Sequence, residues 1–253
     1  MKQVLSGKTL QNVWAPVVQI KPLTTSVLQV FLELPSLLNY EAGQYLEIVM
    51  TDGRQLPFSI ANAPLGSRQI ELHIRHTPEN AVSGNLISEI HTRGGLQIVA
   101  SFGECTHLSL KPNYPVIFMA RGSGFAPIKA IIEQLLADGS TLPMHLYWGS
   151  RNLGDHYLDE LPNNWAERVE TFSYTPVLCP DEPNSEISSK WTGRSGDLID
   201  IIAMDHYPDL SDFQLLAAGP LELIFKARDV FVKQGLKPEN MYADAFAFEK
   251  KTV

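Results

Sequence analysis

A run of five apolar residues at 116–120 (VIFMA), followed by glycines and then by an amphipathic segment, constrains the fold of this chain more than any other feature. Such a run, bounded by proline and glycine, suits a strand that is buried on both faces of a parallel sheet. In residues 127–138 the apolar side chains recur with a helical period, which predicts a helix with Pro127 in its first turn and Gly139 at its end. Strand, glycine turn and helix together predict the first unit of a parallel α/β domain.

Short apolar runs and amphipathic segments continue to alternate after this unit. Alternating strands and helices form parallel, doubly wound sheets with right-handed crossovers. The pattern predicts strands at residues 144–148, 170–178, 213–218 and 241–248, and helices at residues 155–161, 196–203 and 220–234.

The part of the chain before residue 111 has a different sequence pattern. Its segments are short, and clusters of Gly, Asn, Asp and Pro separate them, which indicates an antiparallel barrel or sandwich. The change falls at residues 111–115 (KPNYP), so we expect an antiparallel β-barrel at 1–111 and a doubly wound α/β domain at 112–253. In the first domain, strands are expected at residues 27–34, 45–50, 70–75 and 96–101, with a helix at 80–92.

Composition narrows the classes of function. The 253 residues, 44% hydrophobic and 19% charged, supply enough apolar material for one large core or two ordinary ones, and typical domain sizes favour two. The formal charge of -8 argues against a surface that binds DNA or RNA, because such a surface needs clustered Lys and Arg. With Cys105 and Cys179 alone, the chain lacks the thiolates of an iron–sulfur cluster or a Cys-rich zinc site, and we expect no metal. It has no signal-peptide core and no apolar stretch of the ~18 to 20 residues that cross a bilayer, so a cytoplasmic location is expected.

The glycine turn is the first candidate binding site. Gly122 and Gly124, with Ser123 between them, follow the buried strand and precede the helix, where backbone N–H groups and the positive end of the helix can meet a phosphate. The spacing is G-x-G-x-x-P rather than G-x-G-x-x-G, and the alternative is a tight turn that needs glycine for backbone geometry only. Gly219 and Pro220 form a second junction between strand and helix, which is expected to face the first across a bound nucleotide or else to be a plain turn.

Arg151 ends the second predicted strand of this domain, where the adenosine ribose of a dinucleotide usually lies. An arginine there can pair with a 2′-phosphate, whereas an acidic residue would favour the unphosphorylated ribose. This residue favours NADPH over NADH, with a solvated surface arginine as the alternative.

A Pro-aromatic-Ser run stands out in the barrel half. Pro57 removes one ladder hydrogen bond, so its strand is expected at a sheet edge, where free backbone groups can meet a planar heterocycle. Ser59 would offer its hydroxyl to a ring nitrogen. The alternative is an ordinary edge strand with a serine that faces solvent.

Seven segments together resemble one known family in their order and spacing. They are AGQYL at 42–46, PFSIA at 57–61, ELHIR at 71–75, the turn at Gly103, GSGFAP at 122–127, YWGSR at 147–151 and DAFAF at 244–248. In these segments the chain resembles the ferredoxin–NADP reductase superfamily, and within it the NAD(P)H:flavin reductases and the reductase modules of oxygenase systems. The resemblance implies a barrel that binds FAD or FMN, a domain that binds NADPH or NADH, and hydride transfer where the two domains meet.

The resemblance also implies roles for the Pro-aromatic-Ser run. Ser59 is expected to hydrogen-bond near flavin N5 as the catalytic residue. Pro57, Phe58 and Ile60 are expected to lay backbone groups and apolar surface against the isoalloxazine ring. Hydride transfer needs little acid–base assistance, so the positioning of the two rings is the main task of the protein.

A second group of implied contacts lies on the next strand, at the start of the helix that follows, and near the end of the chain. The strand would border the flavin, the helix start would bind a flavin phosphate, and the terminal phenylalanines would cover the flavin or nicotinamide pocket. A structural role is the alternative for each. The residues are His73, Ile74 and Arg75, then Ser83, Gly84 and Asn85, then Phe246 and Phe248.

The chain departs from the family pattern at four points. Leu56 occupies the place of the arginine that binds the FAD phosphate in the family. Arg121 occupies the place of the first glycine of the turn, where it would either supply the missing cationic contact to the flavin or only line the surface. Ala218 stands where many electron-transferring members have cysteine, and no ferredoxin domain is attached. Of these departures, Leu56 is the one that favours a flavin held weakly, and Ala218 is typical of simple flavin reductases.

Three functions follow as hypotheses. The leading one is an NAD(P)H:flavin reductase that treats flavin as a substrate or a weakly held cofactor, with free flavin as its partner. The second is a reductase with bound FAD that passes electrons to a separate iron–sulfur protein or oxygenase. The third is a non-catalytic regulatory or electron-relay subunit. Flavin content separates the first two, and NAD(P)H oxidation with added flavin excludes the third.

Overall fold

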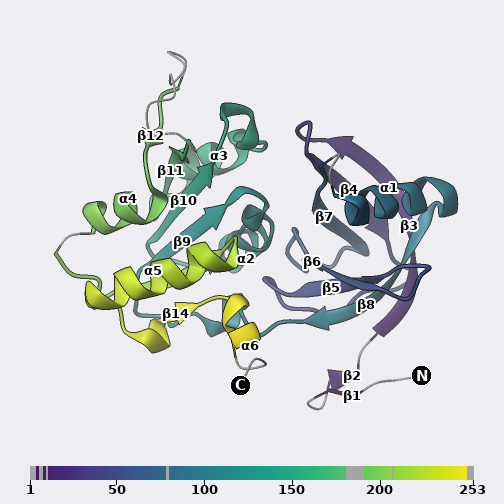
Figure 1. The fold of residues 1–253 in the computed structure, drawn as a ribbon. Helices are drawn as coiled ribbons and strands as arrows, with labels where there is room; N and C mark the ends of the chain where they lie inside the picture. Colours follow the sequence, from purple (N-terminus) through teal and green to yellow (C-terminus); the bar gives the residue numbers. More distant parts are fainter. Residues whose placement is uncertain are drawn as a thin grey trace. The chain divides into compact units, whose positions relative to one another are not determined.

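The computed structural model describes residues 4–5, 8–9, 11–77, 80–180, 191–206 and 208–249. The chain folds into two compact units (Figure 1). Unit 1 comprises Met1–Leu108 and Lys129–Gly139, and unit 2 comprises Ser109–Ile128 and Ser140–Val253. Helix α2 (Phe125–Ala137) is shared, because its first turn belongs to unit 2 and its remainder to unit 1.

Unit 1 is built on six antiparallel strands. They are β3 (Gln11–Pro22), β4 (Val27–Glu33), β5 (Tyr45–Val49), β6 (Gln55–Ser59), β7 (Gln69–Arg75) and β8 (Gly95–Phe102), and β1 (Val4–Leu5) pairs separately with β2 (Lys8–Thr9). Their order in the sheet is β6-β5-β8-β3-β4-β7, so the strand with Pro57 lies at one end of the order. A bridge between Ile60 and Leu72 joins the two end strands, and the Ala61 N–H donates to the Glu71 carbonyl at 2.8 Å. The sheet thereby closes into a barrel.

The pleat of the strands separates the barrel core from the outer face. On β7, Ile70, Leu72 and Ile74 are fully buried in the core. Glu71 and His73 alternate with them and therefore point to the outer face, where both are also buried. These two polar side chains are covered on the outer face by helix α2, whose Lys129 bonds to Glu71.

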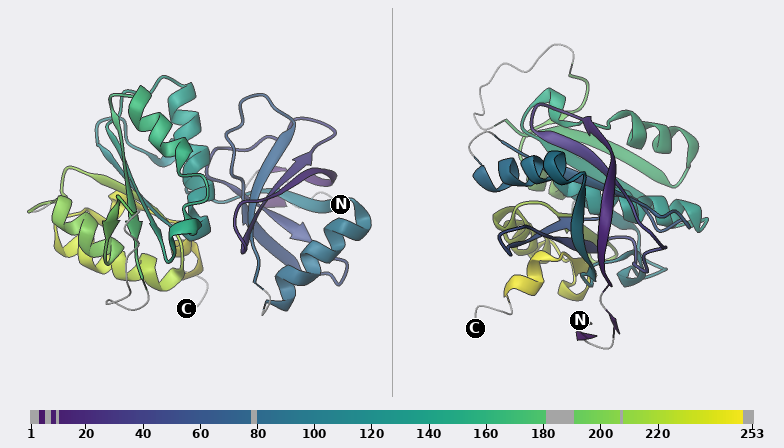
Figure 2. Two further views of the ribbon diagram at one scale, coloured as in Figure 1. Left: turned by 90° about the horizontal axis from the view of Figure 1, so that it is seen from above. Right: turned by 90° about the vertical axis from the view of Figure 1, so that its right-hand side faces the viewer.

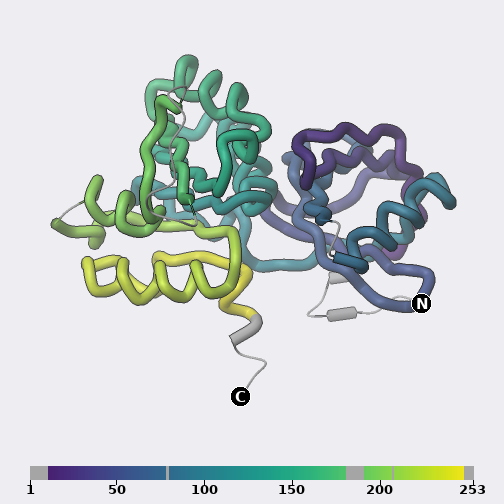
Figure 3. Tube along the Cα trace, turned by 45° about the horizontal axis from the view of Figure 1, so that its top comes forward, coloured from purple at the N-terminus to yellow at the C-terminus, as the bar shows by residue number. Residues whose placement is uncertain are grey.

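Helix α1 (Ala81–Arg93) packs beside β8, as Figure 3 traces. The Asn80 side chain accepts from the N–H groups of Val82 and Ser83 and begins the helix. Gly94, at φ +67°, ends it in the left-handed conformation that glycine adopts without strain.

Unit 2 is built on six parallel strands with helices on both faces (Figure 2). The strands are β9 (Val116–Arg121), β10 (Met144–Ser150), β11 (Phe172–Leu178), β12 (Arg194–Ser195), β13 (Gln214–Ala218) and β14 (Met241–Tyr242), in the order β12-β11-β10-β9-β13-β14. The helices are α3 (Glu160–Arg168), α4 (Leu198–Asp205), α5 (Leu221–Lys233) and α6 (Ala245–Glu249). Neighbouring residues of β10 face opposite layers, since Tyr147 joins the core with α4 and α5 while Trp148 stacks on Phe125. The chain order reverses between β9 and β13, which is the switch point of a doubly wound sheet.

The predicted fold class, an antiparallel barrel followed by a doubly wound parallel sheet, is confirmed. Two predicted elements are wrong. Residues 245–248 are helical rather than extended, because the chain leaves the sheet after Tyr242 and Phe246 packs near Phe225 of α5. The helix expected at 155–161 begins instead at Glu160, with Pro162 in its first turn, where proline is tolerated. Within the described ranges, no helix has the length and apolarity that a bilayer crossing requires.

Candidate functional site

The glycine turn follows β9 directly, as predicted. Residues Gly122–Gly124 form a single 3₁₀ turn, with Gly122 at φ +55°, and α2 begins at Phe125. A Cβ placed on Gly124 would lie 2.1 Å from the Ala218 carbonyl oxygen and 2.9 Å from the Gly219 nitrogen. The two junctions at the switch point are therefore in backbone contact, and a residue with a side chain at position 124 would push them apart.

Two buried aromatic side chains support this turn on its core side. The Trp148 indole N–H donates to the Gly122 carbonyl at 3.0 Å, and the Phe125 ring stacks on Trp148 at 4.0 Å between centroids. Both aromatic side chains are fully buried, whereas Ser123 is half-buried. The turn is thus held rigidly while its outer side stays accessible.

The remaining predicted residues of unit 2 lie at different depths. Arg151 is exposed just past the end of β10, and Gly219 and Pro220 are exposed ahead of α5. Pro127 is half-buried in the first turn of α2. Phe246 is half-buried against the core of unit 2, which favours its structural alternative. The side chain of Phe248 lies outside the described residues.

Ser59 lies on the outer face of the barrel at the end of β6. Its side chain is half-buried and, in the part of the chain that the structure describes, its hydroxyl has no hydrogen-bond partner. It pairs across the sheet with Tyr45, whose ring stacks on Phe102 at 5.5 Å. These two aromatic residues were missed by the sequence analysis, and the alternation along β5, in which Leu46 and Ile48 face inward, is the signal that could have found them.

Phe58 and Ile60 of the Pro-aromatic-Ser run point into the barrel. Ile60 is fully buried in the core, and its N–H donates to the Gln44 carbonyl at 3.0 Å. Phe58 and Leu56 are partly buried against the same core, whereas Pro57 is exposed. The phase of the strand thus sends the Ile60 side chain inward, and the contact of this residue with a ring stays a prediction.

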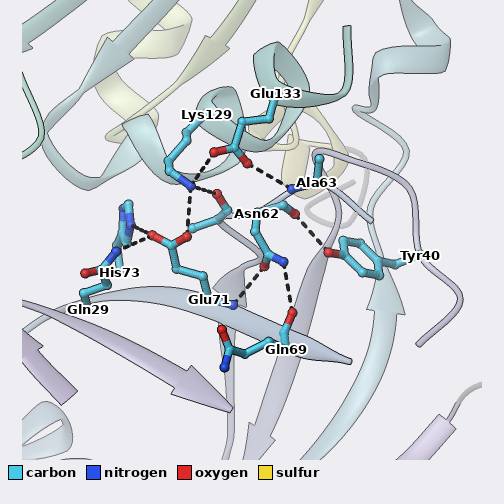
Figure 4. A network of polar contacts seen from close by, with 10 residues as sticks. Gln29, Tyr40, Asn62, Ala63, Gln69, Glu71, His73, Lys129 and Glu133 are labelled. Atoms are coloured by element: carbon cyan, nitrogen blue, oxygen red, sulfur yellow. Dashed lines mark hydrogen bonds and ion pairs between the residues drawn. The ribbon is translucent and has the colours of Figure 1, made fainter. Parts of the chain in front are cut away.

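His73 belongs to a buried charge network rather than to an open site (Figure 4). Its Nε2 donates to Oε1 of Glu71 at 2.8 Å, and the amide of Gln29 donates to the same oxygen at 2.7 Å. Lys129 of α2 donates to the other oxygen of Glu71 at 2.9 Å, to the Ala61 carbonyl at 2.9 Å and to Glu133 at 2.8 Å. All three ammonium protons are thereby used. The His73 side chain is fully buried, so it is not available to a ligand in this arrangement.

Electrostatics within this network favour an ionised Glu71 and a neutral His73. Burial raises the pKa of Glu71, but the hydrogen bond from His73 and the charge of Lys129 outweigh it and bring the pKa from 4.5 down to about 2. Burial lowers the pKa of His73, against the opposing effect of Glu71. The network therefore holds one buried carboxylate against one buried ammonium at neutral pH.

The other residues predicted to contact the flavin differ in exposure and in hydrogen bonding. Ile74 is fully buried in the barrel core, and Arg75 is exposed at the end of β7. At the start of α1, the Ser83 N–H donates to the Asn80 side chain at 3.2 Å and the Gly84 N–H to the Asn80 carbonyl at 3.1 Å. These donors already have acceptors, so this helix start is poorly suited to a phosphate. The neighbouring Asn85 is exposed.

Acidification is expected to destabilise the protein between about pH 6.5 and pH 4. Burial, with His206 nearby, lowers the pKa of His145 from 6.5 to about 4. The folded state keeps this imidazole neutral while the unfolded chain binds a proton, so the stabilisation is complete above the unfolded pKa and is lost as pH falls towards the folded one. The loss is at most roughly 3 kcal/mol.

Urea unfolding at about pH 7 and pH 4.5 measures this loss of stability. His145→Gln, which can still bond Thr175, should lose less stability than the wild type, and an equal loss contradicts the assignment. Exposed His91→Gln is the control.

The chain is similar to known reductases in sequence. Residues 118–229 match a family model described as an oxidoreductase NAD-binding domain. The CDP-6-deoxy-L-threo-D-glycero-4-hexulose-3-dehydrase reductase of Yersinia pestis is 33% identical over 213 residues, which cover 84% of this chain and 61% of that protein. This chain thus spans less than two thirds of that relative. A probable flavin reductase of Vibrio harveyi is 30% identical over 235 residues, which cover 91% of this chain and 97% of the relative.

Two solved structures share the fold. The cytochrome P450 reductase GcoB of Amycolatopsis superposes with a TM-score of 0.80 at 24% identity, covering 92% of this chain and 69% of that one. A ferredoxin NADP+ reductase from Neisseria gonorrhoeae, with bound FAD and NADP, superposes with a TM-score of 0.72 at 14% identity, covering 88% of this chain and 92% of that one. The two-part architecture is therefore shared with reductases that are distant in sequence.

Proposed function

This chain belongs to the flavin reductase family, and from that premise we propose that it transfers hydride from NADPH or NADH to a flavin that it holds weakly or uses as a substrate. The observation that carries the proposal is the contact between Gly124 and the Ala218 carbonyl at the switch point of unit 2. Backbone N–H groups at such a point, next to the positive end of a helix, are suited to the pyrophosphate of a dinucleotide.

The residues of unit 1 fit a planar ring system in the same terms. The Ser59 hydroxyl can donate to a ring nitrogen, and the Tyr45 and Phe102 pair lies beside it as apolar surface. When bound, the flavin supplies the hydride-accepting chemistry. The task of these residues is to orient the ring and exclude water, because the reaction needs little proton transfer from side chains.

The surroundings of Leu56 support weak flavin binding. Leu56 packs partly buried against the barrel core and carries no charge that could hold a phosphate. The nearest arginine in the sequence, Arg54, pairs with Asp52 at 2.7 Å. Leu56 has no guanidinium, and that of Arg54 is already paired with Asp52. We therefore expect little FAD to remain bound.

A second candidate function has support of its own. The relatives include a protein of Yersinia pestis that is named as the reductase of a dehydrase, and a protein of Comamonas that is named as a reductase component of terephthalate 1,2-dioxygenase. A chain of this kind would retain FAD and pass electrons to a separate protein.

Steady oxidation of NADPH or NADH by the purified chain, followed by absorbance with FMN, FAD or riboflavin added, tests the proposed function. We expect turnover that depends on added flavin and a nearly colourless protein after gel filtration. Stoichiometric FAD after gel filtration would favour the second function instead. No oxidation with any flavin would reject both and leave a non-catalytic subunit.

Ser59→Ala is expected to slow hydride transfer by about three- to tenfold, the worth of one net hydrogen bond. Single-turnover reduction of flavin by NADPH measures this rate separately from product release. Ser88→Ala, an exposed serine of α1, is the matched control and should match the wild type. An unchanged rate in Ser59→Ala would remove Ser59 from the reaction.

A further inference from the structure

Arg121 ends β9, and its side chain crosses the carboxyl ends of the neighbouring strands of unit 2. Its Nη2 donates to the Cys179 carbonyl at 3.4 Å, just past the end of β11. Strand β10 lies between β9 and β11 in the sheet, so the side chain passes over the end of β10. The guanidinium is thereby directed away from the glycine turn and towards the β10 side of the switch point.

Two glycines leave room for this path. A Cβ on Gly149, in β10, would lie 3.2 Å from Cδ of Arg121, and a Cβ on Gly219 would lie 2.9 Å from Cβ of Arg121. Both distances are tighter than ordinary contacts. Arginine at position 121 is therefore accommodated by the surrounding sequence, with its stem half-buried between backbone segments.

The guanidinium retains most of its hydrogen-bonding capacity. A guanidinium has five N–H donors. Among the residues that the structure describes, that of Arg121 makes the one long bond to Cys179 and no ion pair. Lys226, a cation of α5 in the same unit, is different because it pairs with Asp197 at 2.8 Å. Arg121 is thus a positioned cation that has no carboxylate partner within the described part of the chain.

The place of this cation indicates the ligand group that it would meet. In a doubly wound nucleotide domain the pyrophosphate lies at the glycine turn, whereas the adenosine ribose lies at the end of the second strand, here β10. The guanidinium reaches past that strand end, on the ribose side. A forked guanidinium matches a phosphate group with two parallel hydrogen bonds.

We propose that Arg121 binds the 2′-phosphate of NADPH and so selects NADPH over NADH; this inference rests on the proposed function. Arg121 acts from the end of the first strand, whereas the exposed Arg151 lies at the end of the second. The role of Arg121 is therefore nucleotide specificity rather than retention of flavin.

Binding of nucleotide fragments tests the role without any flavin or turnover. Calorimetric titration compares 2′,5′-ADP, which carries the 2′-phosphate, with 5′-AMP, which does not. We expect the wild type to bind 2′,5′-ADP more tightly. Arg121→Gln should weaken 2′,5′-ADP by about tenfold or more and 5′-AMP by less than about threefold, and Arg121→Lys should be intermediate. The same contrast should appear between NADP+ and NAD+.

The control is Arg168→Gln, an exposed arginine at the end of α3, which precedes the amino end of β11. It should leave both affinities unchanged. Equal weakening of both ligands by Arg121→Gln would assign Arg121 to a phosphate common to both nucleotides, and unchanged affinities would make it structural; either overturns the inference. A wild type that prefers 5′-AMP also overturns it. A wild type that oxidises NAD(P)H but fails these tests rejects the inference alone, whereas one that binds neither NADP+ nor NAD+ rejects the proposed function.

Discussion

Lys129→Met is expected to destabilise the protein by roughly 3 to 5 kcal/mol, the usual cost of removing one partner from a buried ion pair. The ammonium of Lys129 is bonded to Glu71, Glu133 and the Ala61 carbonyl, and its side chain is 6% exposed. Methionine keeps the length of the stem but leaves the Glu71 carboxylate buried without a cation. Calorimetry should show a melting temperature lower by about 10 °C.

Two further variants make this result specific. Glu71→Gln in the Lys129→Met background removes the orphaned charge and should restore part of the lost stability, so the double-mutant cycle should give a coupling of about 1 to 3 kcal/mol. Lys233→Met replaces an exposed lysine of α5 and should change stability by less than about 0.5 kcal/mol. A loss below about 1 kcal/mol in Lys129→Met would contradict the network.

Gly124→Ala is expected to lower kcat/KM for NAD(P)H by about a hundredfold, because a shift of about 1 Å at a binding element can cost that much. The added Cβ would lie 2.1 Å from the Ala218 carbonyl oxygen, which is backbone and cannot rotate away. The glycine turn and the junction at Gly219 must then separate. Nucleotide affinity, measured by titration, should fall with the rate.

Gly154→Ala is the matched control for this substitution. A Cβ at Gly154 would have no atom within 4 Å, so the variant should bind and react as the wild type does. If Gly124→Ala retained both nucleotide affinity and rate, the contact between the two junctions would have no part in binding.

The sequence predicted most of the fold because the strongest signals are local. The apolar run of β9, the helical period of α2 and the turn clusters of the barrel each lie within about a dozen residues. The longest strand, β3, was missed because a proline and polar residues interrupt its alternation, while the sheet on both sides completes it. The error at α6 has a similar origin, since alternating Ala and Phe fit a strand as well as a helix.

The candidate site was predicted unevenly. Its two glycine junctions could be placed together from sequence, because the carboxyl ends of neighbouring parallel strands share one edge. The inward and outward faces of β6 could not be predicted from the sequence. In the run LPFSI, only the closed barrel decides that Ile60 points inward and Ser59 outward. The burial of His73 was equally hidden, because Lys129, which neutralises the carboxylate beside it, lies 58 residues from Glu71 on a helix.

By itself, then, the sequence determined the fold class, most of the strands and helices, the two glycine junctions and the family, all of which depend on short segments and their spacing. The tertiary structure alone decided which charges are paired, which face of each barrel strand is open, and where the Arg121 guanidinium lies. The physical reason is that burial and charge pairing depend on groups that are distant along the chain and are brought together only by the register of the strands and the packing of the helices.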